Sequence, residues 1–412
     1  MKIVSVFLIS VAIFFAGCSQ YPLQPLSDNA KPIEQKFVLR VALYPWIPES
    51  ESFFTWIERS FEAKNPDIDL VVRPMSKANK VDLSYDIKAA RSALGDANSE
   101  DYQHLVEIDT LILGSLVKGG GIIQPFFLER HDYFDFAKQA VEIDGRFYGV
   151  PHWSCGNFLI TTIDSVANAG SAKELRAALV AQGSAYPDLA GDLIGSWSSV
   201  VTYLDAYVDT YPGVDLAEAL NNTNLDTQVS DALAAVGSAC TSSGAGLCDR
   251  NDAAIVKEFA AGRLDALIGY SERLNPIFAD PDNQISLSKV HITPAPLGVG
   301  KTAFLFTDAL VLSSACSSRR CVDAAKKFAE FYVSDAVMES SMKSTDGGAS
   351  AVPRYLLPST RSAINRVIHD PIYRQLAPIL STARPYPNQG VPEARERGAI
   401  KSAVDTLIHP TP

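Results

Sequence analysis

The chain is poor in the residues that most metal sites and most nucleic-acid interfaces require. Its 412 residues include only six cysteines and six histidines, with neither a Cys-x-x-Cys nor a His-x-x-x-His spacing, so the sequence argues against a zinc site. The 36 lysines and arginines are outnumbered by 47 aspartates and glutamates, which gives a net charge of −11. Because nucleic acid requires a basic face, we expect no nucleic-acid partner. An acidic protein is better suited to meet a cation.

The N-terminus differs in kind from the rest of the chain. Lys2 precedes an apolar run, and Ala16-Gly17-Cys18 supplies the small residues that a signal peptidase requires. These residues resemble a bacterial lipoprotein signal, which implies a signal peptide over 1–17, lipidation of Cys18 and a membrane anchor there. The Pro- and Ser-rich stretch 18–36 would then be a tether. An ordinary secretory signal cut near Ser19 to Tyr21 is the alternative, so we expect an exported protein, either anchored as a lipoprotein or periplasmic or secreted.

The length of the chain and its alternating patterns predict an α/β fold with two lobes. A chain of 412 residues with 47% apolar composition is too long for one simple core. A strand pattern over 37–44, a helix pattern over 51–64 and a strand pattern over 68–73 form the βα repeat of a parallel sheet. Strand patterns lie on both sides of two crossings, near Pro151 and Gly300. We therefore expect one lobe from 37–150 plus 300–348 and a second from 151–299 plus 349–408.

Further elements follow from the same periodicities. We expect strands over 105–115, 158–163, 263–270, 290–294 and 303–312, helices over 172–182, 197–208, 229–243, 252–261 and 321–333, and a helical tail over 360–407. The run Gly-Val-Gly-Lys-Thr at 298–302 invites interpretation as a phosphate loop. We reject it because Pro294 and Pro296 interrupt the loop and no helix pattern follows Lys301.

Cys155 stands out because it has no nearby cysteine to pair with. Asp144-Gly145 predicts a hairpin turn before it, and Pro151 is expected to end that ribbon. Gly156, which lacks a Cβ, allows a backbone or a ligand to come close. In an exported protein the pairs Cys240/Cys248 and Cys316/Cys321 would each close a short loop as a disulfide, which leaves Cys155 as a free, reactive thiol. A buried small hydrophobe is the alternative interpretation of Cys155.

Three motifs carry a resemblance to a known family. They are Ala-Leu-Tyr-Pro-Trp-Ile-Pro (42–48), Pro-His-Trp-Ser-Cys-Gly-Asn-Phe-Leu (151–159) and Gly-Tyr-Ser-Glu (269–272). Together they make the chain similar to the thiamine pyridinylase (thiaminase I) family, whose members have the two-lobed fold of type II periplasmic solute-binding proteins with a cleft between the lobes. The resemblance implies that Cys155 is the nucleophile and Glu272 its base. It also implies that Asp109 and Asp308 face the thiamine cation and that Tyr44 and Tyr270 stack on it.

The chemistry of this family explains these residue types. A thiolate adds to the electron-poor pyrimidine of thiamine, the thiazole leaves, and an outside amine or thiol takes the pyrimidinylmethyl group. A free thiol is only a few per cent ionised near neutral pH, so a base within hydrogen-bond reach is required. The resemblance therefore implies a transferase whose partners are thiamine and a base or thiol acceptor, and it implies no cofactor and no metal.

Each of these residues also has an ordinary interpretation. Asp109 and Asp308 could pair with strand-end partners, Tyr44 and Tyr270 could be core residues, and Glu272 could form a surface ion pair with Arg273. A second function class is a non-catalytic lipoprotein that binds thiamine or a related cation for an ABC uptake system. The two classes differ in whether Cys155 and Glu272 meet across one cleft, since a binding protein has no use for a thiolate with a base beside it.

Overall fold

The computed structural model describes the chain from residue 35 to residue 409 apart from several short segments. The described ranges are 35–73, 83–183, 188–214, 216–221, 224–241, 247–249, 253–348 and 351–409. The predicted signal peptide, Cys18 and all but the last two residues of the predicted tether lie outside them. Lys36–Pro412 forms one compact unit. No described helix is both long enough and apolar enough to cross a membrane.

Strands and helices alternate through most of this unit. The strands are β1 Phe37–Ala42, β2 Ile68–Val72, β3 Leu105–Asp109, β4 Ile123–Gln124, β5 Glu142–Ile143, β6 Arg146–Phe147, β7 Val150–Cys155, β8 Phe158–Thr161, β9 Leu189–Gly191, β10 Ala266–Gly269, β11 His291–Pro294, β12 Phe304–Ser313, β13 Leu357–Pro358 and β14 Arg384–Pro385. The α-helices are α1 Ser50–Lys64, α2 Ile87–Gly95, α3 Leu113–Lys118, α4 Asp135–Ala140, α5 Asp164–Ala167, α6 Ala172–Gln182, α7 Ser198–Thr210, α8 Leu216–Asn221, α9 Thr227–Thr241, α10 Ala253–Ala260, α11 Leu274–Ala279, α12 Arg319–Tyr332, α13 Asp335–Met342, α14 Arg361–Val367, α15 Pro371–Thr382, α16 Val391–Arg397 and α17 Ala399–Ile408.

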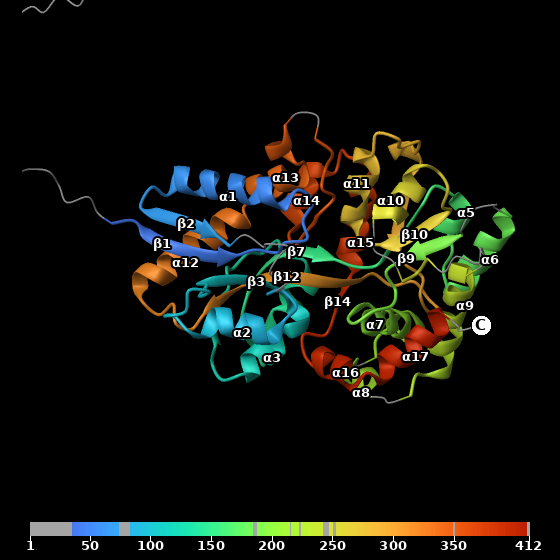
Figure 1. The fold of residues 1–412 in the computed structure, drawn as a ribbon, viewed down its shortest axis with the longest axis horizontal. Helices are drawn as coiled ribbons and strands as arrows, with labels where there is room; N and C mark the ends of the chain where they lie inside the picture. The colour runs from blue at the N-terminus through green and yellow to red at the C-terminus, as the bar shows by residue number, and fades with distance from the viewer. Residues whose placement is uncertain are drawn as a thin grey trace, which may run out of the picture. The chain divides into compact units, whose positions relative to one another are not determined.

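The described strands form two main sheets. The larger has the order β13-β7-β12-β3-β1-β2, with β4 and β14 also pairing with β12, and the smaller has the order β11-β8-β10-β9. Strand β1 is parallel to β2 and β3, whereas β12 is antiparallel to β3. Figure 1 shows α1 and α12 on one side of the larger sheet and α2 and α3 on the other. Because both faces are covered, β3 and β12 are buried along their whole length, as their apolar sequences predict.

Two details differ from the sequence predictions. Pro151 does not end the ribbon but lies inside β7, at a position beyond the reach of β13, which pairs only with Trp153 and Ser154. A proline is tolerated there because no second neighbour needs its missing N–H. The predicted strand 105–115 ends at Asp109, where a 3-10 helix over Thr110–Ile112 and then α3 begin.

The chain does not pass from one sheet to the other at the positions where the sequence placed the lobe boundaries. Strand β7 belongs to the larger sheet through Cys155, and β8 opens the smaller sheet at Phe158, so the first crossing lies beyond Pro151. Strands β13 and β14, which the sequence placed with the second lobe, pair with β7 and β12 of the larger sheet. A strand pattern reveals burial and not the partner strand, so the sequence could not show which sheet these segments join. The lobe boundaries stay a prediction.

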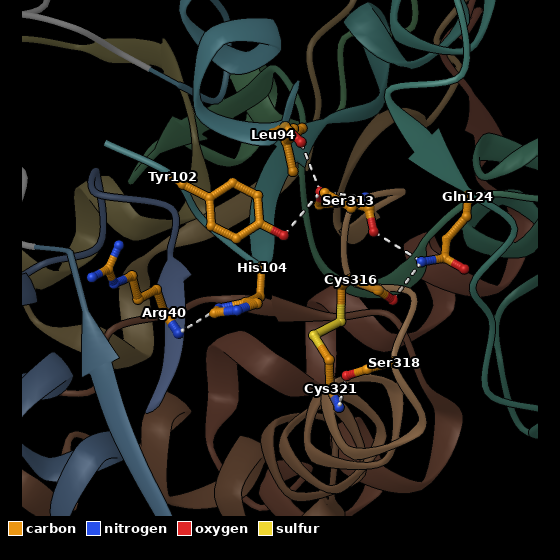
Figure 2. The surroundings of a disulfide bond; sticks show 10 residues. Arg40, Leu94, Tyr102, His104, Gln124, Ser313, Cys316, Ser318 and Cys321 are labelled. Atoms are coloured by element: carbon orange, nitrogen blue, oxygen red, sulfur yellow. Dashed lines mark hydrogen bonds between the residues drawn. A yellow bond between two sulfur atoms is a disulfide. The ribbon is translucent and has the colours of Figure 1, made fainter. Parts of the chain in front are cut away.

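The cysteine pairing expected from spacing is confirmed. Cys240 and Cys248 form a disulfide with 5.7 Å between their Cα atoms, and Cys316 and Cys321 form one with 5.5 Å. Figure 2 shows the second disulfide, where Gln124 Nε2 donates hydrogen bonds to the carbonyl oxygens of Ser313 (2.8 Å) and Cys316 (3.0 Å). This disulfide therefore joins the end of β12 to the start of α12. Among the described cysteines, Cys155 is free.

The glycine-rich segment before β12 is held by a carboxylate. Asp209, near the end of α7, accepts hydrogen bonds from the backbone N–H groups of Leu297 (2.9 Å), Gly298 (3.2 Å) and Thr302 (2.6 Å). A Cβ at Gly298 would lie 2.4 Å from the carbonyl oxygen of Ala206, so only glycine fits so close to the helix. Burial raises the pKa of Asp209 to about 7, against the effect of these hydrogen bonds.

Candidate active site

Two aspartates stand opposite each other on neighbouring strands of the larger sheet. Asp109 is the last residue of β3, and Asp308 lies in the middle of β12 as its register partner. Directly opposed residues in an antiparallel pair have Cα atoms about 4.5–5.5 Å apart, so the two side chains leave the sheet on the same face. Both residues are buried, and Asp109 Oδ1 also accepts a hydrogen bond from the N–H of Leu111 (2.8 Å). Two carboxylates this close suit a cation.

Cys155 ends strand β7 beside this pair. Its register partner is Phe306, two residues before Asp308 on β12. A Cβ at Gly156 would lie 2.6 Å from the carbonyl oxygen of Phe304, so of the two expected possibilities, a backbone or a ligand, it is the backbone of β12 that comes close. Burial raises the pKa of the Cys155 thiol well above its ordinary value, and the negative charges of Asp308, Glu272 and Asp109 raise it further. The resting side chain is therefore a neutral thiol that needs a base.

Glu272 reaches the same place from the smaller sheet. Ser271–Arg273 forms a 3-10 helix that begins directly after Tyr270. Ser271 Oγ donates a hydrogen bond to the carbonyl oxygen of Tyr355 (2.7 Å), which anchors this helix. Burial raises the pKa of Glu272, and the charge of Arg273 opposes part of that shift. A carboxylate with a raised pKa is a stronger base for a neighbouring thiol.

Tyr44 follows β1 and is fixed by a buried carboxylate. Its N–H donates to Glu107 Oε2 (2.8 Å), and the same carboxylate contacts His152 Nδ1 (2.6 Å) and the Tyr332 hydroxyl (3.1 Å). Burial raises the pKa of Tyr44, and the charges of Asp308, Cys155, Glu272 and Tyr270 add to the effect. The structure thus brings together all six residues that the resemblance assigned to the site. Burial lowers the pKa of His152, and the Glu107 carboxylate opposes part of that shift.

Aromatic residues that the sequence did not single out complete the surroundings. The Tyr85 ring meets Tyr44 edge-on at 6.5 Å and packs at 5.9 Å against Trp197. On the other side, Tyr386 stacks on Phe306 at 4.0 Å, and its hydroxyl donates to Asp205. Nothing in the local sequence of Tyr85 predicts its position, since it comes from the segment after β2. The Pro-Tyr-Pro run at 385–387 was the available signal for Tyr386, because it interrupts a helical tail.

The arrangement can perform nucleophilic chemistry and offers no evident metal site. The described residues contain no cluster of three or more His, Cys, Asp or Glu side chains able to hold a metal ion. A thiol, a base and two carboxylates instead converge from two sheets. Such a site can bind an organic cation, deprotonate the thiol and form a covalent bond to an electron-poor carbon.

Comparison with known proteins gives a consistent result. No family model matches the chain. Over 360 residues the chain is 25% identical to thiaminase-1 of Paenibacillus thiaminolyticus, a match that covers 83% of this chain and 81% of the relative. Its fold resembles Clostridium botulinum thiaminase I in complex with thiamin (TM-score 0.70, 20% identity, 89% of this chain and 100% of the other). It also resembles maltose-bound MalE3 of T. maritima (TM-score 0.65, 14% identity, 90% and 98%). The resemblance expected from three motifs is therefore confirmed: the chain is similar to thiaminase I in sequence, and it has the two-lobed type II periplasmic-binding-protein fold.

Proposed function

We propose that this protein is a thiamine pyridinylase of the thiaminase I type, a transferase that cleaves thiamine at its methylene bridge. The observation that carries the proposal is the convergence of Cys155 and Glu272, from different sheets, on the opposed pair Asp109 and Asp308. A binding protein would need the carboxylates and the aromatic rings but not a buried thiol beside a base. Similarity to thiaminase I supports the same conclusion.

Each residue has a role in the proposed reaction. Glu272 takes the proton of Cys155, whose raised pKa would otherwise leave the thiol unreactive. The thiolate forms a bond to the electron-poor ring carbon of the pyrimidine, and electrons pushed out of the ring break the bond between the methylene and the thiazolium. The thiazole departs with that electron pair. An amine or thiol acceptor then bonds to the methylene, and the Cys155 thiolate is released.

Binding of the substrate rests on charge and aromatic faces. Asp109 and Asp308 face the fixed positive charge or the aminopyrimidine, and Tyr44 and Tyr270 stack against the rings. The half-buried Tyr270 lies edge-on to Phe306, with 6.4 Å between ring centroids, so it forms a wall next to the register partner of Cys155.

The N-terminal sequence supports export as part of the function. We propose that residues 1–17 are a signal peptide and that Cys18 is lipidated, so that the enzyme is held at a membrane by a lipid anchor. Two disulfides agree with an oxidising compartment. Globomycin-sensitive processing, or labelling of the wild-type chain and not of Cys18→Ala with a fatty-acid analogue, tests the anchor.

The decisive experiment uses thiamine with an added acceptor. Wild type should release thiazole, whereas Cys155→Ser should lose turnover and still bind thiamine, because the substitution leaves the carboxylates in place. Mass spectrometry of wild type with a thiamine analogue should find the adduct on the Cys155 peptide and none on Cys155→Ser. Undiminished turnover in Cys155→Ser contradicts the proposal. Tight thiamine binding with no turnover in wild type would instead favour the solute-binding function.

A further inference from the structure

A cavity lies next to the candidate site, at the edge of the smaller sheet. Its empty space, about 350 Å³, includes the open mouth and the solvent in front of it. Strands β9 and β10 run parallel and end there, so Asp192 and Tyr270 follow them at the same edge, and Asn157 precedes β8 beside them. None of Cys155, Glu272, Asp109 or Asp308 lines the cavity. It therefore lies beside the reacting groups, and Tyr270 is the residue that it shares with the substrate site.

The lining combines an apolar wall with two opposite charges. Ile255 and Val256 of α10 and Leu267 of β10 supply the wall, and Asp192 and Arg273, both half-buried, supply the charges. Asp192 Oδ1 accepts a hydrogen bond from Ser198 Oγ (3.1 Å). The aliphatic stem of Arg273 lies over Gly269, where a Cβ would meet its Cγ at 3.5 Å. No hydrogen bond or salt bridge joins the Arg273 guanidinium to the part of the chain that the structure describes.

Tyr270 connects the cavity with the reacting groups. Its ring lines the cavity, and its hydroxyl lies within the electrostatic reach of Cys155, Asp192 and Glu272 together. Asn157 provides a second connection, since it lies two residues after Cys155 and its amide donates to Asp205 Oδ2 (2.5 Å). A small molecule in the cavity would thus have one end near the cysteine and the other against Arg273.

We propose that this cavity is the subsite of the acceptor, and that it selects a small amine that also carries a carboxylate, with the carboxylate paired to Arg273 and the uncharged amine donating to Asp192. The proposal rests on the proposed function, because an acceptor is needed only in a group-transfer reaction. Opposite charges on an apolar wall match a compact molecule with an amine, an apolar body and a carboxylate, and a guanidinium binds a carboxylate through two parallel hydrogen bonds.

The bond changes at this subsite are balanced. The amine nitrogen forms a bond to the methylene of the pyrimidine held on Cys155. Electrons return to the ring, the bond between the ring carbon and the sulfur breaks, and Cys155 leaves as a thiolate. The proton released by the amine passes to the Asp192 carboxylate.

The test compares two acceptors that differ in one group, 3-aminobenzoate and aniline, in the full-length protein. In wild type the KM for 3-aminobenzoate should be at least tenfold lower than the KM for aniline. In Arg273→Gln the two values should become equal, with the KM for thiamine unchanged within about twofold. Arg263→Gln is the matched control, because Arg263 is exposed and pairs with Glu258. The KM ratio is the readout because the effect of Arg273 on Glu272 is common to both acceptors.

The outcomes separate this inference from the proposed function. An equal KM for the two acceptors in wild type, or an equal change for both in Arg273→Gln, would overturn the acceptor subsite. Thiamine cleavage with 2-mercaptoethanol, an uncharged acceptor, tests the enzyme independently of Arg273. If that reaction is absent, the proposed function fails. Calorimetric binding of 3-aminobenzoate to wild type, lost in Arg273→Gln and kept in Arg263→Gln, still supports the cavity as a site for an amine that carries a carboxylate.

Discussion

Replacing Glu107 by Gln should lower the free energy of unfolding by about 3–5 kcal/mol and weaken thiamine binding. Three donors converge on the Glu107 carboxylate: the Tyr44 N–H, the Tyr332 hydroxyl and Nδ1 of His152, assigned as protonated because its partner only accepts. An amide of the same shape has a single acceptor oxygen, and its NH₂ must face at least one of these donors. The magnitude follows from about 1–3 kcal/mol for one unsatisfied buried group plus roughly 1 kcal/mol for each hydrogen bond that is no longer charge-assisted.

Denaturant unfolding monitored by circular dichroism measures this loss, and thiamine titration measures the second effect. Tyr44 is held by the same carboxylate, so the affinity for thiamine should fall even though Glu107 does not face the substrate. Tyr332→Phe is the matched control. It should destabilise wild type by about 1 kcal/mol but have a smaller effect in the Glu107→Gln background, because the lost partner is shared. A loss below about 1 kcal/mol in Glu107→Gln, or full additivity with Tyr332→Phe, would refute the three-donor assignment.

Four further outcomes are expected. Glu272→Gln should lower the rate of thiamine cleavage by about 10²–10⁴, with partial recovery as pH rises. The surface variant Glu258→Gln is the control and should keep the wild-type rate. An unchanged rate in Glu272→Gln would remove Glu272 from the mechanism. Asp308→Asn should raise the Kd for thiamine by about 10–100-fold, since a charge pair near 5 Å is worth about 3 kcal/mol before desolvation is subtracted; a shift in kcat alone would contradict this. Replacing Cys316 and Cys321 together by Ser should cost about 2 kcal/mol in denaturant unfolding, as expected for so short a loop. Burial raises the pKa of Asp205 to about 8, so the folded protein keeps a proton that the unfolded chain loses near pH 4. The free energy of unfolding should therefore fall as pH rises from about 4 to 8. In Asp205→Asn the melting temperature should not show this decrease over the same pH range.

Tyr44, Cys155, Tyr270 and Glu272 could be proposed from the sequence because each belongs to a short motif at or just after the end of a strand. Cys155 and Tyr270 lie where apolar strand runs stop, and the end of a strand is where a side chain can leave the sheet and face a ligand. The roles proposed for these residues could be carried over from the motifs of the thiaminase I family. The pairing of Asp109 with Asp308 could not be predicted, because register between strands almost 200 residues apart leaves no local signal.

Other features failed for identifiable physical reasons. Pro151 was expected to end a strand, but it lies at a position with one neighbouring strand, where its missing N–H costs nothing. The 3-10 turn Ser271–Arg273 was not predicted, because three residues are too few to show a helical periodicity. Glu107 was passed over because a single carboxylate in an apolar run does not reveal which donors will surround it.

The loop held by Asp209 explains why a phosphate-loop pattern can appear without a phosphate. Successive backbone N–H groups of such a loop form a concave nest that attracts an anion. In this protein the anion is a side chain of the same chain, so the nest is occupied as soon as the protein folds. Its glycines are required by the close approach of α7, with a Cβ at Gly300 only 2.5 Å from the carbonyl oxygen of Asp209. The same residue pattern can thus bind a nucleotide phosphate or close a loop against a helix. The two cases differ in the anion that the loop holds, which is a phosphate in the first and an aspartate side chain in the second.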